Sequence, residues 1–323
     1  MSENERLLAP HQIPGCLWNP LTGVLTLPEA LASAYVALTD HHGLREQGLA
    51  REKGSGATGG QSRSEQLDYF AKKFDGSSAR AMLTILDPES KAGTTSDRIL
   101  ASIAGNVVCM TDAPCGAGAA SLGLLCTLSV LREKGVLPRM PLTVRWVGGE
   151  LSPHAIELSQ AMFEAVASAL EAQAIFLDRQ WIQWNVTDPM STADLVRASE
   201  RASVAADMRL LIVANFSSAL QRDQRREAAR SQLEEVFRYA SGTNSAAVWI
   251  EPDMNISMDR GGLFSWLRRE FKSLWDRMAG PEPESNPDEP AHRCEASFVL
   301  PLKPDTTSRV TLAVMPISFA RRA

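Results

Sequence analysis

Asp112 follows a short apolar run that is typical of a buried strand, residues 107–111 (VVCMT), and precedes the turn-forming residues 113–118 (APCGAG). Glycines in such a turn let a ligand approach the backbone closely, because no Cβ intervenes. The helix start that follows presents free N–H groups, which suit an anionic group such as a carboxylate or a phosphate. The segment therefore predicts a ligand-binding turn, although a Gly-containing turn by itself occurs at many strand-to-helix connections.

A second acid, Glu150, ends another apolar run and precedes Leu151 and the helix-starting pair Ser152-Pro153. An acid at the end of the second strand of a nucleotide-binding fold can accept hydrogen bonds from both hydroxyls of a ribose. Taken alone, Glu150 is explained equally well as an acid near a helix N-terminus, where the helix dipole favours negative charge. Together with the turn after Asp112, it predicts a site for a nucleoside.

These two segments, DAPCGAG and GGELSPHAIELS, resemble the first two motifs of the class I, Rossmann-like S-adenosylmethionine-dependent methyltransferases. Pro114 stands where that family commonly has its first glycine, and the spacing from Asp112 to Glu150 is longer than usual. The resemblance covers about residues 106–319. Residues 1–105 match no family that we can name.

The resemblance implies roles for particular residues. The Asp112–Gly118 turn would hold the methionine part of S-adenosylmethionine, Glu150 the ribose and Leu151 the adenine. After the third strand, Asn185 or alternatively Asp188 would contact the adenine amino group. After the fourth strand, Asn215 and Phe216 would line the methyl-transfer site, where the alternative is a simple strand-to-helix turn. The implied cofactor contacts are Asp112, Pro114, Cys115, Gly116, Gly118, Glu150, Leu151, Asn185 and Val186.

The elements that must position these residues alternate from residue 106 onward. Strands are expected at 106–111, 142–148, 181–186, 209–215 and 246–251, and helices at 118–134, 153–171, 191–204 and 218–240. Such alternation indicates a parallel sheet covered on both faces. Two last runs, 296–302 and 309–317, are too close for a crossover helix and should be antiparallel. We therefore expect an α/β fold with a doubly wound, mostly parallel, seven-stranded sheet and a C-terminal antiparallel hairpin.

We expect two domains, a mostly helical N-terminal region (1–105) that recognises substrate or partner and a methyltransferase domain (106–323). The N-terminal region should hold a small hairpin, a helix after Pro28, a helix capped by Ser64 and two short helices. The hairpin falls within 17–27, the short helices lie near 77–86 and 96–104, and the polar, Gly/Ser-rich residues 43–63 should form a mobile loop. Residues 263–278 should form a core-packing helix with a basic face, or alternatively a docking surface for RNA or a protein partner.

Composition narrows the functional classes. The 323 residues carry 33 basic and 38 acidic side chains, so any nucleic-acid or membrane-surface binding would need a local patch. Five scattered cysteines form no Cys-x-x-Cys pair, which argues against structural zinc, other metal sites and a disulfide framework. The first residues lack a secretory apolar core, and the uncharged stretch 113–131 begins with turn residues that leave too short a helix to cross a bilayer. We expect a cytosolic protein without a membrane segment.

The expected activity is methyl transfer to a nucleic acid, a protein or a small molecule, and no residue stands out as a base. One alternative is a non-catalytic S-adenosylmethionine-binding scaffold or partner subunit. The other is an NAD(P)-dependent oxidoreductase, against which Ser121 counts, since the third position of that fingerprint requires Gly or Ala.

Overall fold

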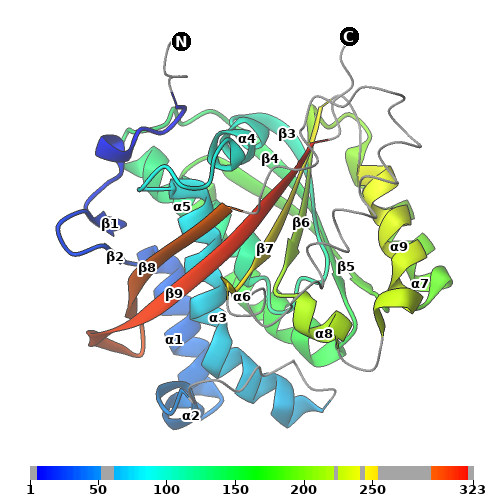
Figure 1. The fold of residues 1–323 in the computed structure, drawn as a ribbon, viewed down its shortest axis with the longest axis horizontal. Helices are drawn as coiled ribbons and strands as arrows, with labels where there is room; N and C mark the ends of the chain where they lie inside the picture. The colour runs from blue at the N-terminus through cyan, green and yellow to red at the C-terminus, as the bar shows by residue number, and fades with distance from the viewer. Residues whose placement is uncertain (1–5, 52–61, 222–224, 241–243, 254–291, 319–323) are drawn as a thin grey trace.

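A computed structural model describes residues 6–51, 62–221, 225–240, 244–253 and 292–318 of the chain. Its core is one sheet, whose strands follow the order β1-β2-β8-β9-β7-β6-β3-β4-β5 (Figure 1). The strands are β1 (Trp18–Asn19), β2 (Val24–Leu25), β3 (Asn106–Asp112), β4 (Leu142–Glu150), β5 (Ile175–Gln183), β6 (Met208–Ala214), β7 (Ser245–Glu251), β8 (His292–Leu300) and β9 (Lys303–Ser318).

The central strands are parallel, as the sequence predicts. β3 pairs in parallel with β4 on one side and with β6 on the other, and β5 and β7 extend the sheet in the same direction. β9 runs antiparallel to both β7 and β8, which confirms the C-terminal hairpin. The doubly wound α/β fold is therefore confirmed, with the order of the strands reversing on either side of β3.

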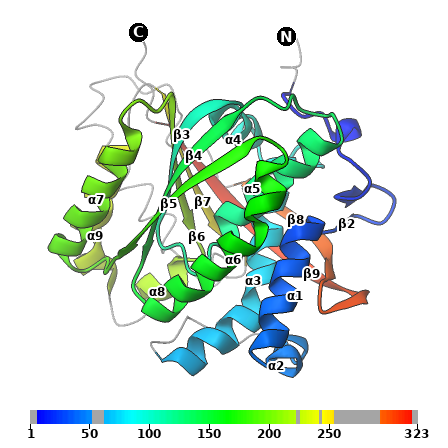
Figure 2. The same cartoon turned by 180° about the vertical axis from the view of Figure 1, so that it is seen from behind.

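Helices cover both faces of this sheet (Figures 1 and 2). They are α1 (Glu29–His41), α2 (Arg45–Leu49), α3 (Arg63–Leu86), α4 (Thr95–Ser102), α5 (Ala119–Glu133), α6 (Pro153–Glu171), α7 (Pro189–Ser203), α8 (Ser217–Gln221) and α9 (Arg225–Ala240). Alternate residues of β6 show the two layers. Leu210 and Ile212 join the core beneath α1 and α3–α6, whereas Leu211 and Val213 join the one beneath α7–α9.

The sheet differs from the prediction at both of its edges. Among the described residues it has nine strands and not seven, because β2 pairs in parallel with β8 and brings the expected N-terminal hairpin into the sheet. β5 was expected at 181–186 but begins at Ile175, since Ile175 pairs with Leu142 of β4. β5 is an edge strand with several half-buried and exposed side chains, so it lacks the apolar run that marks the inner strands. The hairpin between β8 and β9 turns at residues 301–302, earlier than the expected connection at 303–308.

The N-terminal helices also correct the prediction. α3 is one continuous helix whose cap is Ser62 and not Ser64, so the short helix expected near 77–86 is its second half. The small residues there resemble a turn in sequence, but they let α3 pack closely on α5: a Cβ added at Gly123 would lie 2.8 Å from the Ser78 carbonyl oxygen. Part of the loop expected over 43–63 is helix α2, and residues 52–61 lie outside the described residues.

The expected basic helix at 263–278 also lies outside the described residues. Within the described ranges, no helix combines the length and the apolar character that crossing a bilayer requires.

Candidate functional site

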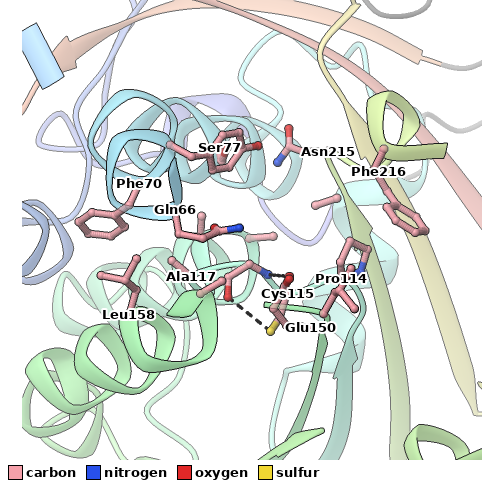
Figure 3. A pocket seen from close by; sticks show the side chains of 18 of the residues that line it. Gln66, Phe70, Ser77, Pro114, Cys115, Ala117, Glu150, Leu158, Asn215 and Phe216 are labelled. Carbon is pink, nitrogen blue, oxygen red and sulfur yellow. Dashed lines mark hydrogen bonds between the residues drawn. The ribbon is translucent and has the colours of Figure 1, made fainter. Parts of the chain in front are cut away.

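A hollow lies at the carboxyl ends of β3, β4 and β6, where the strand order reverses (Figure 3). In open α/β sheets this switch point is where ligands bind. The turn after β3, the acid at the end of β4 and the loop after β5 form its floor. The segment after β6 and one side of α3 form its walls, so the central part of the chain and the N-terminal region build the site together.

The two glycines of the turn after β3 have different tasks. Gly118 caps α5 at φ 82°, and a Cβ there would lie 2.7 Å from a ring carbon of Phe163 on α6, so only glycine lets α5 and α6 pack this closely. Gly116, at φ 52°, lines the hollow, and a Cβ there would meet no atom within 4 Å. The backbone of Gly116 therefore presents open space in which a ligand can lie against the turn.

Glu150 lies next to this turn with both carboxylate oxygens engaged by backbone N–H groups. Gly116 N donates to Oε2 at 3.0 Å and Ser152 N donates to Oε1 at 2.9 Å. Each carboxylate oxygen has two lone pairs, so acceptor capacity remains on both. Burial raises the pKa of Glu150 above its ordinary value. Leu151, which is 37% exposed, follows it along the wall of the hollow.

Asp112, by contrast, is completely buried beneath the turn and does not line the hollow. Its Oδ2 accepts a hydrogen bond from the Ser121 hydroxyl at 2.6 Å. The hydroxyl oxygen of Ser121 in turn accepts from the indole N–H of Trp146 at 2.8 Å. Burial raises the pKa of Asp112 to about 7. In this structure Asp112 holds the start of α5 on the sheet, and its implied contact with the cofactor stays a prediction.

The loop after β5 supplies Trp184, Asn185 and Val186 to the hollow. Asn185 Oδ1 accepts from the backbone N–H of Thr187 at 3.1 Å and from its hydroxyl at 2.9 Å. These two bonds use both lone pairs of the oxygen, which leaves the amide N–H₂ as the free part of the side chain. Asp188 instead caps α7 by accepting from Met190 N at 2.9 Å, and it does not line the hollow. Asn185 therefore lines the hollow and Asp188 does not, but the free part of Asn185 is a donor and cannot accept from an adenine amino group, so the implied contact with that group stays a prediction.

Asn215 and Phe216 follow β6 and line the opposite wall. Asn215 has a left-handed backbone at φ 54°, and its buried Oδ1 has no hydrogen-bond partner among the described residues. Figure 3 shows its side chain facing Ser77 of α3. The ring of Phe216 packs between Trp184 and Trp249, with centroids 5.9 and 6.3 Å away. The two predicted acceptor-site residues thus lie in the same hollow as the turn and Glu150.

Glu251, at the end of β7, fixes this wall from behind. It is fully buried, and its Oε1 accepts from Phe216 N at 2.7 Å, Ser217 N at 2.8 Å and the Trp249 indole at 2.9 Å. The Ser217 hydroxyl donates to Oε2 at 2.7 Å. Burial raises the pKa of Glu251. The sequence analysis missed this residue, although it is a third acid at the end of an apolar run, as Asp112 and Glu150 are.

The side of α3 that faces the hollow was also missed. It contributes five residues to the lining, namely Gln66, Tyr69, Phe70, Phe74 and Ser77. Apart from the adjacent pair Tyr69 and Phe70, they are three or four residues apart, which places them on one helix face. Polar residues inside such a stripe are the signal that could have marked α3 as part of a site. The remaining predicted residues, Pro114 and Cys115, do line the hollow, and burial raises the pKa of the Cys115 thiol.

No family model matches the chain, and no curated protein matches it. Three solved structures that it resembles are described as methyltransferases. A class I S-adenosylmethionine-dependent methyltransferase of Listeria monocytogenes is 14% identical over 90% of this chain and 86% of that one, with a TM-score of 0.30. Loganic acid methyltransferase with SAH is 10% identical over 67% and 65%, at 0.33. The glycopeptide N-methyltransferase MtfA, complexed with sinefungin, is 10% identical over 70% and 81%, at 0.24.

Proposed function

We propose that this chain is an S-adenosylmethionine-dependent methyltransferase. The observation that carries the proposal is the pairing of Glu150 with the Gly116 turn. They come from adjacent parallel strands, they are joined by a 3.0 Å hydrogen bond, and they form the floor of one hollow. A carboxylate with free lone pairs beside an unobstructed glycine backbone suits a ribose and the chain attached to it.

The other lining residues support the same ligand. Leu151, Leu158 and Val186 offer apolar contacts for a base, and the amide of Asn185 offers it a polar partner. When bound, the cofactor supplies a methyl group that its sulfonium already makes electrophilic. The tasks of the protein are then alignment and the exclusion of water. In this proposal Phe70 and Phe74 of α3 exclude water, and the unpartnered Oδ1 of Asn215 orients an acceptor by accepting its N–H or O–H.

The test is the affinity for S-adenosylmethionine and S-adenosylhomocysteine, measured by titration calorimetry. Glu150→Ala should weaken binding by about 1.5–3 kcal/mol, roughly 10- to 150-fold, because charge-assisted hydrogen bonds to the ribose are lost. Glu150→Gln keeps the shape of the side chain but offers one acceptor oxygen in place of two, so its affinity should lie between those of the wild type and Glu150→Ala. Glu164→Gln, which alters an ion pair between the exposed Glu164 of α6 and Arg179 of β5, is the control and should bind as wild type does. Unchanged affinity in Glu150→Ala would refute the assignment.

Two alternatives make different predictions. Two observations disfavour an NAD(P)-dependent oxidoreductase. Ser121, which donates a hydrogen bond to Asp112, stands at the third position of the dinucleotide-binding fingerprint, where that fold requires Gly or Ala. The last strand, β9, is antiparallel to β7. A cofactor-binding scaffold would bind the nucleoside without turnover. Incubation with methyl-labelled cofactor and separate RNA, DNA, protein and metabolite pools distinguishes the scaffold from the enzyme. Label in one pool also identifies the class of acceptor. The cytosolic location and the RNA or protein partner stay predictions.

A further inference from the structure

Arg80 of α3 is a half-buried cation that does not itself line the hollow but contacts a residue that does. Its Nη2 donates to the hydroxyl of Ser77, which lines the hollow, at 3.2 Å. Its Nε is buried and has no hydrogen-bond partner among the described residues. Within those residues, no carboxylate oxygen lies within 4.0 Å of the guanidinium. Burial lowers the pKa of Arg80, as expected for a cation taken out of water.

The acids that influence Arg80 through space are already committed elsewhere. They are Asp75 and Glu251, and Tyr69 is the third titratable group that acts on it. Asp75 forms an ion pair with Arg51. Glu251 accepts four hydrogen bonds from Trp249 and the start of α8. Lys73 lies two helical turns earlier on α3, and burial and then the charge of Arg80 lower its pKa.

The position of Arg80 indicates what it could meet. The Ser78 hydroxyl donates to the Ala119 carbonyl oxygen at 3.2 Å, which puts this part of α3 directly over the start of α5. Ser77 faces Asn215 across the hollow (Figure 3). An anion that binds the Ser77 hydroxyl there would lie near the N-terminal end of α5 and next to the guanidinium that contacts this hydroxyl. A planar guanidinium matches the geometry of a carboxylate, and leaving it unpaired costs free energy.

We propose that Arg80 and Ser77 bind a carboxylate of a ligand in the hollow, at the place where Ser77 faces Asn215. The inference rests on the proposed function, because it takes the hollow to be the cofactor and acceptor site. The carboxylate has two sources with the same chemistry: the amino-acid end of the cofactor, or an acidic small-molecule acceptor.

Two nucleosides distinguish these sources, S-adenosylhomocysteine and 5′-methylthioadenosine, which lacks the amino-acid end. Their affinities are measured by titration calorimetry for the wild type, Arg80→Met and Arg80→Lys, with thermal unfolding as a check on folding. Arg179→Met removes one positive charge from the surface and is the matched control. Transfer of labelled methyl to the anionic and neutral pools of a metabolite extract, separated on an anion-exchange resin, is measured for the same variants.

If Arg80 binds the cofactor, Arg80→Met should weaken the affinity for S-adenosylhomocysteine at least tenfold and leave the affinity for 5′-methylthioadenosine within twofold of the wild-type value. Arg80→Lys, which keeps the charge and loses the planar fork, should lie between. If Arg80 binds the acceptor, both affinities stay unchanged, but Arg80→Met loses at least tenfold of label transfer to the anionic pool. Either pattern supports the proposal, and Arg80→Lys supplies it if Arg80→Met does not fold.

The proposal is overturned if both nucleosides weaken equally, since Arg80 would then act only through the fold. It is also overturned if neither the affinities nor transfer to the anionic pool changes. A wild-type chain that binds neither nucleoside overturns the proposed function and this inference with it. If the wild-type chain binds both nucleosides and the Arg80 variants change neither the affinities nor label transfer to the anionic pool, the inference alone is overturned.

Discussion

The ends of β3 and β4 carry the same kind of residue after the same kind of strand, and the two acids have different surroundings. Asp112 lies beneath the turn, completely buried, with the Ser121 hydroxyl on one oxygen. Glu150 lies above the turn, with backbone N–H groups on both oxygens and acceptor capacity directed to the hollow. Glu251 at the end of β7 resembles Asp112, since four donors surround it in the core.

The difference teaches that an acid at a strand end marks the functional edge of the sheet without identifying the residue that meets a ligand. The donors that fold around each carboxylate decide this. Side-chain donors from the interior, such as Ser121 and Trp249, turn an acid into a structural element. Donors from the turn alone leave the carboxylate open on its other side.

Removing Glu251 should have the largest effect on stability. Glu251→Ala leaves Phe216 N, Ser217 N and the Trp249 indole without their acceptor, and should lower the free energy of unfolding by about 3–5 kcal/mol. Urea denaturation followed by tryptophan fluorescence measures this as a lower midpoint. Glu251→Gln keeps one acceptor oxygen in place and should lose clearly less. Equal losses in the two variants would contradict the role given to these hydrogen bonds.

Asp112 should make stability depend on pH in a window set by its pKa. The pKa is about 7 in the folded chain and about 3.9 when unfolded. The folded state therefore binds more protons than the unfolded state between these values, so stability falls as the pH rises from about 4 to about 7. The loss is about 4 kcal/mol and is constant above that range. Glu150 and Glu251 add to the same trend, because burial raises their pKa values as well.

Asp112→Asn isolates the contribution of Asp112. The amide oxygen of the asparagine can still accept from Ser121, and the amide does not titrate, so the side chain stays neutral at every pH tested. Unfolding in urea at pH 5 and pH 8 should show a smaller difference for Asp112→Asn than for the wild type. Identical pH dependence in both would mean that Asp112 keeps an ordinary pKa in the fold.

The parts of the fold that were predictable have a strong local pattern. The inner strands β3, β4, β6 and β7 are buried on both faces, so continuous apolar runs mark them within one or two residues. β5 is half solvated and was misplaced, because its burial depends on a single neighbour, β4. The hairpin of β1 and β2 was predicted, but its pairing with β8 was not, because that pairing is set by contacts between distant parts of the chain.

The residues of the site also differ in whether a local sequence pattern predicts them. Gly116, Glu150, Asn185 and Asn215 were predictable because each follows a strand, and parallel strands end at one edge. The α3 wall was not, because its place depends on how the helix packs across α5. Only that packing brings Tyr69 and Ser77 to a turn about 40 residues later in the chain.

The smallest expected effects compare the two glycines of the turn. Gly118→Ala should lose about 2–3 kcal/mol of stability, since it adds both a left-handed alanine and a contact with Phe163. Gly116→Ala has the first cost only, about 1–2 kcal/mol, because its Cβ meets no protein atom. That Cβ would enter the space proposed for the cofactor, so Gly116→Ala should also weaken S-adenosylhomocysteine at least tenfold.

Gly135→Ala is the matched control for the glycine in the hollow. Gly135 has a φ of 71° and open space around its Cβ, as Gly116 has, but it follows the far end of α5 and does not line the hollow. The two alanine variants should therefore unfold at similar urea concentrations while only Gly116→Ala loses affinity for the nucleoside. Equal affinities would mean that the ligand does not lie against the turn, and the distinction between a structural acid below it and a binding acid above it would have to be abandoned.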